Sequence, residues 1–215
     1  MTYIFTSAQM KTTVENRSLT TASGLNENQR TATVMYGLRA LGIEIKGDDI
    51  SHYYRPGTGF TEKGLRAIVP LLAKGNYFAN PRNLNVFSEV VKLDIAGKLR
   101  SGEISKSPDN DPASIYQSPD NLVPFLIGDT LGKDVALAKM AYMALGIMDH
   151  QTFTEKCGSN WTFYSTPEQK ATKDFQQQFN VKLEENDQPG RLGKKTVSAI
   201  VEALEGERTR PYQGI

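Results

Sequence analysis

Apolar residues recur at spacings of three and four along most of this 215-residue sequence. Such spacing places them on one face of an α-helix, so each segment predicts an amphipathic helix with a buried stripe. A clear example is the stripe of Val197, Ile200, Val201 and Leu204. On this basis, helices are predicted over residues 27–42, 61–74, 85–99, 133–148, 166–180 and 194–205. The sequence therefore predicts an all-α protein with no sheet larger than two short strands.

Residues at the helix ends support these boundaries. Asn26 can cap the first helix, and Gln29 stands three residues later, as in a capping box. At the fifth helix, Glu168 or Gln169 is expected to complete a similar box. Pro70 lies inside the second stripe and is expected to kink or shorten that helix, because proline removes a backbone donor.

A stretch of Pro, Ser, Asp and Asn over residues 101–121 predicts a linker. The chain is thus expected to form two small helical domains. Residues 1–25 are expected to form either an extended arm that docks on a partner or a disordered terminus. The expected order is arm 1–25, helical domain 26–100, linker 101–121, second helical domain 122–206 and tail 207–215.

Two short segments recur in the same order in both halves. Ala-Leu-Gly-Ile ends a helix at residues 40–43 and again at 144–147. Ala-Ile-Val followed by Leu occurs at residues 67–72 and again at 199–204. Amphipathic helices produce such matches by chance, but the conserved order favours an internal duplication, with a degenerate copy in the N-terminal half.

The last third of the chain carries a recognisable pattern. Phe175-Gln176 stands late in the fifth helix, a loop with Asp187 and Gly190 follows, and Gly193-Lys194-Lys195-Thr196 opens the sixth helix, with Ala199 in its body. Over residues 133–205 this pattern resembles the peptidoglycan-binding domain family, a three-helix module of bacterial and phage wall hydrolases. The resemblance implies a C-terminal three-helix bundle that binds cell wall.

Most residues of this pattern have a structural interpretation. Gly190 and Gly193 permit a tight loop, Leu192 is expected in the core, and Thr196 is expected to satisfy an amide of the first helical turn. The ligand-binding residues implied by the resemblance and by the neighbouring aromatic cluster are Trp161, Tyr164, Asp187 and Arg191. The alternative is that the aromatic rings cover the core between helices; it is favoured for Trp161 and Phe163, and Tyr164 is left open.

Charge and composition exclude several functions. The chain has 25 basic and 24 acidic residues, so nucleic acid and membrane surfaces are not expected as partners. With two histidines and one cysteine in no recognisable motif, no catalytic residue, metal site or cofactor is expected. The sequence also has neither a run of about 20 apolar residues nor a secretory signal pattern.

Three functions follow as alternatives. The first is a non-catalytic peptidoglycan-binding protein that belongs to a phage particle, with peptidoglycan or other virion proteins as partners. The second is a phage virion structural protein that uses the same helical fold only for assembly, as an oligomer or assembly component. The third is a wall hydrolase with its site in residues 26–100. The expected location is the virion or the cytoplasm of the producing cell, with action at the bacterial cell wall.

Overall fold

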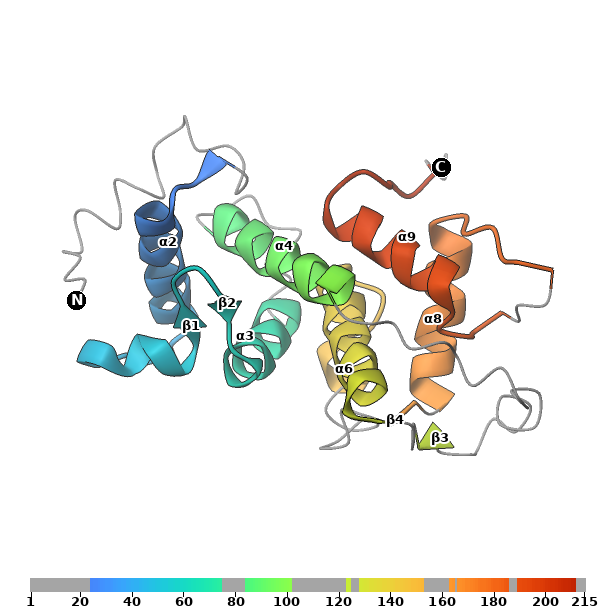
Figure 1. Ribbon diagram of the computed structural model, residues 1–215, viewed down its shortest axis with the longest axis horizontal. Helices are drawn as coiled ribbons and strands as arrows, with labels where there is room; N and C mark the ends of the chain where they lie inside the picture. The colour runs from blue at the N-terminus through green and yellow to red at the C-terminus, as the bar shows by residue number, and fades with distance from the viewer. Residues whose placement is uncertain are drawn as a thin grey trace. The chain divides into compact units, whose positions relative to one another are not determined.

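In the computed structural model of the protein (Figure 1), the residues that the structure describes are 24–74, 84–101, 123–124, 128–152, 163–164, 166–185 and 189–211. Its helices of more than six residues are α2 (Glu27–Ala40), α3 (Glu62–Lys74), α4 (Asn85–Ser101), α6 (Gly128–Ala144), α8 (Thr166–Gln178) and α9 (Lys194–Leu204). Each corresponds to one of the six predicted helices, so the mostly helical character is confirmed.

The remaining described elements are short. They are the 3-10 helix η2 (Gly47–His52), the single turn α7 (His150–Thr152), and strands β1 (Tyr54–Arg55), β2 (Gly59–Phe60), β3 (Val123–Pro124) and β4 (Phe163–Tyr164). Strand β1 pairs antiparallel with β2, and β3 pairs antiparallel with β4. Within the described ranges, no sheet therefore exceeds two short strands, as predicted.

The chain divides into two compact units, Met1–Asp94 and Ile95–Ile215. The division falls within α4. Of the predicted linker 101–121, only Ser101 belongs to the described residues, and of the predicted arm only Gly24 and Leu25 do.

The N-terminal unit begins with the predicted capping box. The Gln29 amide donates to Asn26 Oδ1 over 2.9 Å, and the Asn26 amide donates to Gln29 Oε1 over 3.0 Å. In the core of this unit the Phe87 ring packs edge-on against Phe60, with centroids 6.1 Å apart. It also lies against Gly37, where an added Cβ would stand 2.3 Å from the ring. Helix α2 therefore approaches α4 closely only because residue 37 has no side chain.

Helix α3 is not shortened at Pro70. It continues through this residue to Lys74, the end predicted for it. The residues on either side, Ile68, Val69 and Leu72, are fully buried. Burial of this stripe stabilises the helical path more than one missing backbone hydrogen bond destabilises it, because most helical stability in proteins comes from packing.

The C-terminal unit is built around α6. This helix contacts α8, α9 and β4 (Figure 1). All ten residues from 135 to 144 are buried, including the side chains of Lys139 and Tyr142. On α9 the predicted stripe is buried as well, with Ile200 at 0% exposure. A helix buried on every side must satisfy its polar groups within the protein.

The two Ala-Leu-Gly-Ile segments have the same backbone conformation. Gly42 has φ +78° and Gly146 has φ +67°. The Ile43 amide donates to Leu38 O over 2.9 Å, and the Ile147 amide donates to Tyr142 O over 2.8 Å. Both helices thus end in the glycine-capped turn in which the residue after glycine reaches back five positions.

The matched segments lie at α2 and α3 in the N-terminal half and at α6 and α9 in the C-terminal half. Between α2 and α3, where every residue is described, the chain forms η2 and the β1–β2 hairpin. It has no helix there that would correspond to α8, which separates α6 from α9 in the C-terminal unit.

Among the described helices, none combines the length and the apolar character needed to cross a bilayer.

Replacing Ile200 by alanine should lower the free energy of unfolding by about 2–5 kcal/mol, because it leaves a cavity at a fully buried position. Urea denaturation followed by circular dichroism measures this loss. Ser198→Ala, an exposed position of the same helix, is the matched control and should change stability by less than about 0.5 kcal/mol. A loss below about 1 kcal/mol for Ile200→Ala would mean that α9 does not pack through this face.

Candidate functional site

The side chain of Gln176 joins α8 to the loop that precedes α9. Its Nε2 donates to Arg191 O over 3.0 Å and to Thr196 Oγ1 over 2.9 Å. Its Oε1 accepts from the Gly190 amide over 2.8 Å. Gln176 is 5% exposed, so these bonds form away from water. The glutamine of the Phe-Gln pair therefore fixes the loop that contains both motif glycines.

Position 190 requires glycine for two reasons, the backbone conformation of the residue and the lack of space for a side chain. Its φ of +89° lies in the region that favours glycine. A Cβ at this position would also stand 3.1 Å from Gln169 O. The close approach of the loop to α8 therefore requires glycine at position 190.

Three buried hydroxyl groups attach the same loop to the core. Tyr142 Oη lies 2.7 Å from Thr172 Oγ1, and Tyr164 Oη bonds both Thr172 Oγ1 and Gly190 O. A carbonyl oxygen only accepts hydrogen bonds, so the single proton of the Tyr164 hydroxyl is donated to Gly190 O. Tyr164 Oη must then accept a hydrogen bond from the Thr172 hydroxyl. Thr172 Oγ1 in turn accepts a hydrogen bond from the Tyr142 hydroxyl. Burial raises the pKa of Tyr142 above its usual value, so this proton stays in place at neutral pH.

A buried ion pair lies beside these hydroxyls. Lys139 Nζ of α6 is 2.8 Å from Glu168 Oε1 of α8, and both side chains are 1% exposed. Glu168 and Thr172 are one helical turn apart, as are Lys139 and Tyr142, so one face of α6 meets one face of α8 through polar contacts. Glu168 thus faces the core, while Ser165, a cap candidate of the capping box predicted at the start of α8, lies outside the described residues.

Two further expectations about this loop need correction. Thr196 does not satisfy an amide of the first turn. Its hydroxyl accepts from Gln176 and donates to Arg191 O over 3.3 Å, because the folded loop places that carbonyl next to the helix start. Leu192 is half-buried and is not a full core residue, while Gly193 beside it is buried.

The four predicted ligand residues have different surroundings. Trp161 and Asp187 lie outside the described residues. Tyr164 is 1% exposed and bonded to Gly190, which gives it a structural role and removes its ring from any surface that a ligand reaches. Arg191 is half-buried, and its carbonyl belongs to the Gln176 network.

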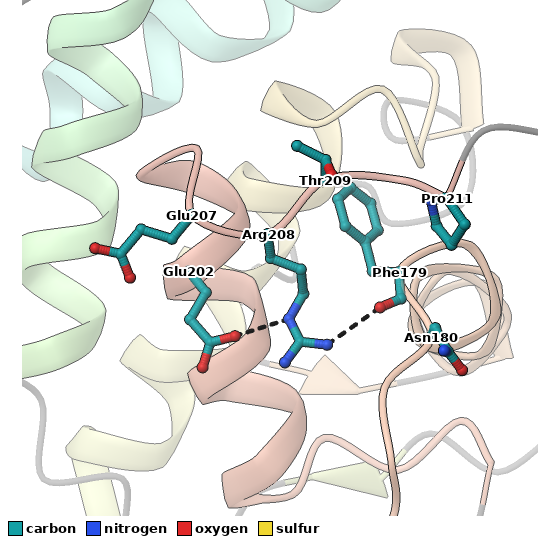
Figure 2. Close-up of a pocket in the computed structure, with 7 residues that line it drawn as sticks. All are labelled: Phe179, Asn180, Glu202, Glu207, Arg208, Thr209 and Pro211. Atoms are coloured by element: carbon teal, nitrogen blue, oxygen red, sulfur yellow. Dashed lines mark hydrogen bonds and ion pairs between the residues drawn. The ribbon is translucent and has the colours of Figure 1, made fainter.

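A shallow pocket of about 440 Å³ opens elsewhere on the C-terminal unit (Figure 2). This volume is within the range of about 300–1,000 Å³ that is usual for ligand sites. Its walls come from the end of α8, the last turn of α9 and the segment after α9. The lining residues are Phe179, Asn180, Glu202, Glu207, Arg208, Thr209 and Pro211.

Arg208 is the central side chain of this pocket (Figure 2). Its Nε donates to Glu202 Oε2 over 2.7 Å, and its Nη1 donates to Phe179 O over 3.1 Å. Among the described residues, Nη2 has no partner and remains for a ligand. Because Arg208 and Glu202 neutralise each other, the centre of the pocket favours polar, weakly charged groups over a strong ion.

Asn180 supplies the opposite wall. It is exposed and has φ +48°, the left-handed conformation that follows a helix end. Its amide offers both a donor and an acceptor. Sequence patterns did not identify this pocket for two reasons. An asparagine after a helix is usually interpreted as a helix cap, and no pattern in the C-terminal tail predicts that Arg208 lies near Asn180.

In the described parts of the chain, no three His, Cys, Asp or Glu side chains gather closely enough to hold a metal ion. Cys157 lies outside these parts.

Truncating Gln176 to alanine should lower the free energy of unfolding by about 2–4 kcal/mol. The change leaves the Gly190 amide unsatisfied in a buried place, which costs about 1–3 kcal/mol, and it removes one of the two donors to the Arg191 carbonyl, a hydrogen bond that contributes about 1 kcal/mol. Gln177→Ala, at the neighbouring exposed position, is the control and should have little effect. Equal stability of the two variants in urea titration would contradict the role given to Gln176.

Glu168→Gln should destabilise the protein by about 3–5 kcal/mol, because it removes one member of a buried ion pair and leaves the other in place. The double variant Lys139→Met with Glu168→Gln should recover much of this loss, since it removes the buried charge altogether. Thermal or urea unfolding measures both. Additive losses in the double variant would show that the two side chains do not interact.

Comparison with known proteins does not assign this chain to a family. No family model matches the sequence, and no match was found among curated proteins or solved structures. A function for this chain is therefore inferred from its own residues and contacts.

Proposed function

We propose that this protein is a non-catalytic peptidoglycan-binding protein that acts through its C-terminal unit. The observation that carries the proposal is the hydrogen-bond network of Gln176. The motif residues Gln176, Gly190 and Thr196 are far apart in sequence yet directly connected by this one amide. Phe175 and Ala199 of the same motif are both buried beneath it. The residues behind the resemblance thus act together as one structural unit.

The chemistry of the pocket supports a ligand of this class. Peptidoglycan consists of N-acetylated sugars and short peptides, so it presents many amide and hydroxyl groups that donate and accept hydrogen bonds. The pocket offers the Asn180 amide, the Thr209 hydroxyl and Arg208 Nη2. These groups form hydrogen bonds with amides and hydroxyls, while Phe179 and Pro211 add apolar surface.

The same pocket supports binding without cleavage. Glycoside hydrolysis requires a carboxylic acid in a water-excluded environment, together with a second carboxylate or a positioned water. In the pocket, Glu202 is paired with Arg208 and Glu207 is exposed. Neither carboxylate lies in a water-excluded environment.

Sedimentation of the full-length protein with purified peptidoglycan sacculi tests the proposal. Retention with the pellet is expected, and Asn180→Gly should weaken it by about three- to tenfold, which corresponds to one hydrogen bond. Glycine keeps the left-handed backbone of residue 180 and removes only its amide. Lys170→Ala, an exposed site of α8 away from the pocket, is the control and should bind normally.

Two results would contradict the proposal in different ways. Release of soluble fragments from the sacculi would show an enzyme instead of a binding protein. Absence from the pellet, together with oligomers in sedimentation velocity, would favour the alternative of a virion structural protein.

A further inference from the structure

The segment Glu207–Pro211, called the strap below, turns back over the C-terminal unit after α9. Gly206 has φ +79°, and the Glu207 amide donates to Glu202 O over 2.9 Å, which reverses the chain. Arg208 then donates to Phe179 O over 3.1 Å. Arg210 donates to Leu145 O, and its guanidinium carbon lies 5.4 Å from the centre of the Phe179 ring.

The two arginines bind the ends of two other helices. Phe179 directly follows α8, and Leu145 directly follows α6. The last carbonyls of a helix lack partners within the helix and carry partial negative charge, so they attract cationic donors. The strap therefore attaches at two defined points, one on each helix.

Most of the pocket is formed by the strap. Four of its seven lining residues, Glu207, Arg208, Thr209 and Pro211, belong to the strap (Figure 2). The rest of the unit contributes only Phe179, Asn180 and Glu202. Without the strap, only the walls from the end of α8 and from Glu202 of α9 would remain.

The contacts that hold the strap are weak. Thr209, Arg210 and Pro211 are exposed, and the Arg208 side chain is 30% exposed. Exposed polar contacts contribute little to stability, and none of the strap residues is buried. The strap is therefore able to leave the helix ends while the core of the unit stays folded.

We propose that docking of the strap assembles the binding pocket, and that a bound peptidoglycan fragment holds the strap in place. This inference rests on the proposed function and specifies how its site forms. A ligand that contacts Asn180 on one wall and Arg208 or Thr209 on the other binds only the docked state. Such a ligand must shift the equilibrium toward docking, because it binds one of the two states preferentially.

Limited digestion with trypsin measures strap docking directly. The bond after Arg208 lies in the strap and is open to the protease only when the strap leaves the helices. The bond after Arg210 precedes proline and is resistant to trypsin. With soluble peptidoglycan fragments at ten times their Kd, cleavage after Arg208 should slow by about tenfold. Cleavage after the exposed Lys182, outside the pocket, should keep its rate.

The variant Arg210→Ala provides a second test, because Arg210 holds the strap but does not line the pocket. It should speed up cleavage after Arg208 and weaken sacculus binding by about three- to tenfold, while the melting temperature changes little. Lys170→Ala again serves as the control.

The outcomes separate this inference from the proposed function. If the protein binds sacculi but the ligand gives no protection at Arg208, or Arg210→Ala binds as tightly as the natural protein, strap docking does not form the site. If the full-length protein fails to bind sacculi, the proposed function fails and this inference fails with it.

Discussion

The C-terminal unit depends on one buried primary amide. The loop before α9 presents a donor, the Gly190 amide, and two oxygens, Arg191 O and Thr196 Oγ1, to the same side chain. A carboxylate at position 176 would have no proton to donate, and a lysine would have no oxygen to accept. Among long side chains, an amide satisfies all three groups, so the chemistry of the loop and the identity of Gln176 determine each other.

A second set of polar contacts places α6 and α8 in register. The hydroxyls of Tyr142, Thr172 and Tyr164 form a chain that ends on Gly190, and the Lys139–Glu168 pair lies next to it. Burial of these groups is costly unless every partner is present. Sliding α8 along α6 by one turn would separate the Tyr142–Thr172 and Lys139–Glu168 contacts at once, so these contacts select one arrangement of the two helices. The buried polar groups thus destabilise any other arrangement of α6 and α8 in which they would lack their partners.

The sequence predicted what local rules determine. Six helices followed from the apolar stripes, and the Asn26–Gln29 box and the Gly42 turn followed from residues within a few positions of each other. The buried polar contacts were not predicted, although the positions of their residues in the sequence gave an indication that these residues face the core. Glu168 and Thr172 fall on the same inward stripe as Phe175, and Lys139 stands within an otherwise apolar run. Which acid meets which base depends on how helices cross, and periodicity contains no such information.

The pocket was beyond sequence reasoning for a different reason. Its residues come from the ends of two helices and from a tail without periodicity, so they meet only through the long-range bonds of Arg208 and Arg210. The Arg210 bond is exposed and the Arg208 bond is partly buried, whereas two of the three Gln176 bonds are buried. The unit therefore combines a loop that is fixed by core contacts with a strap that is attached at the surface. Opening the strap breaks its polar bonds and the contact of Arg210 with the buried Phe179 ring, and it leaves the bonds of the Gln176 network in place, so ligand binding can close the strap at little expense to the fold. A site formed by the loop that Gln176 binds could not open in this way, because opening it would break the buried hydrogen bonds that join α8 to the loop before α9.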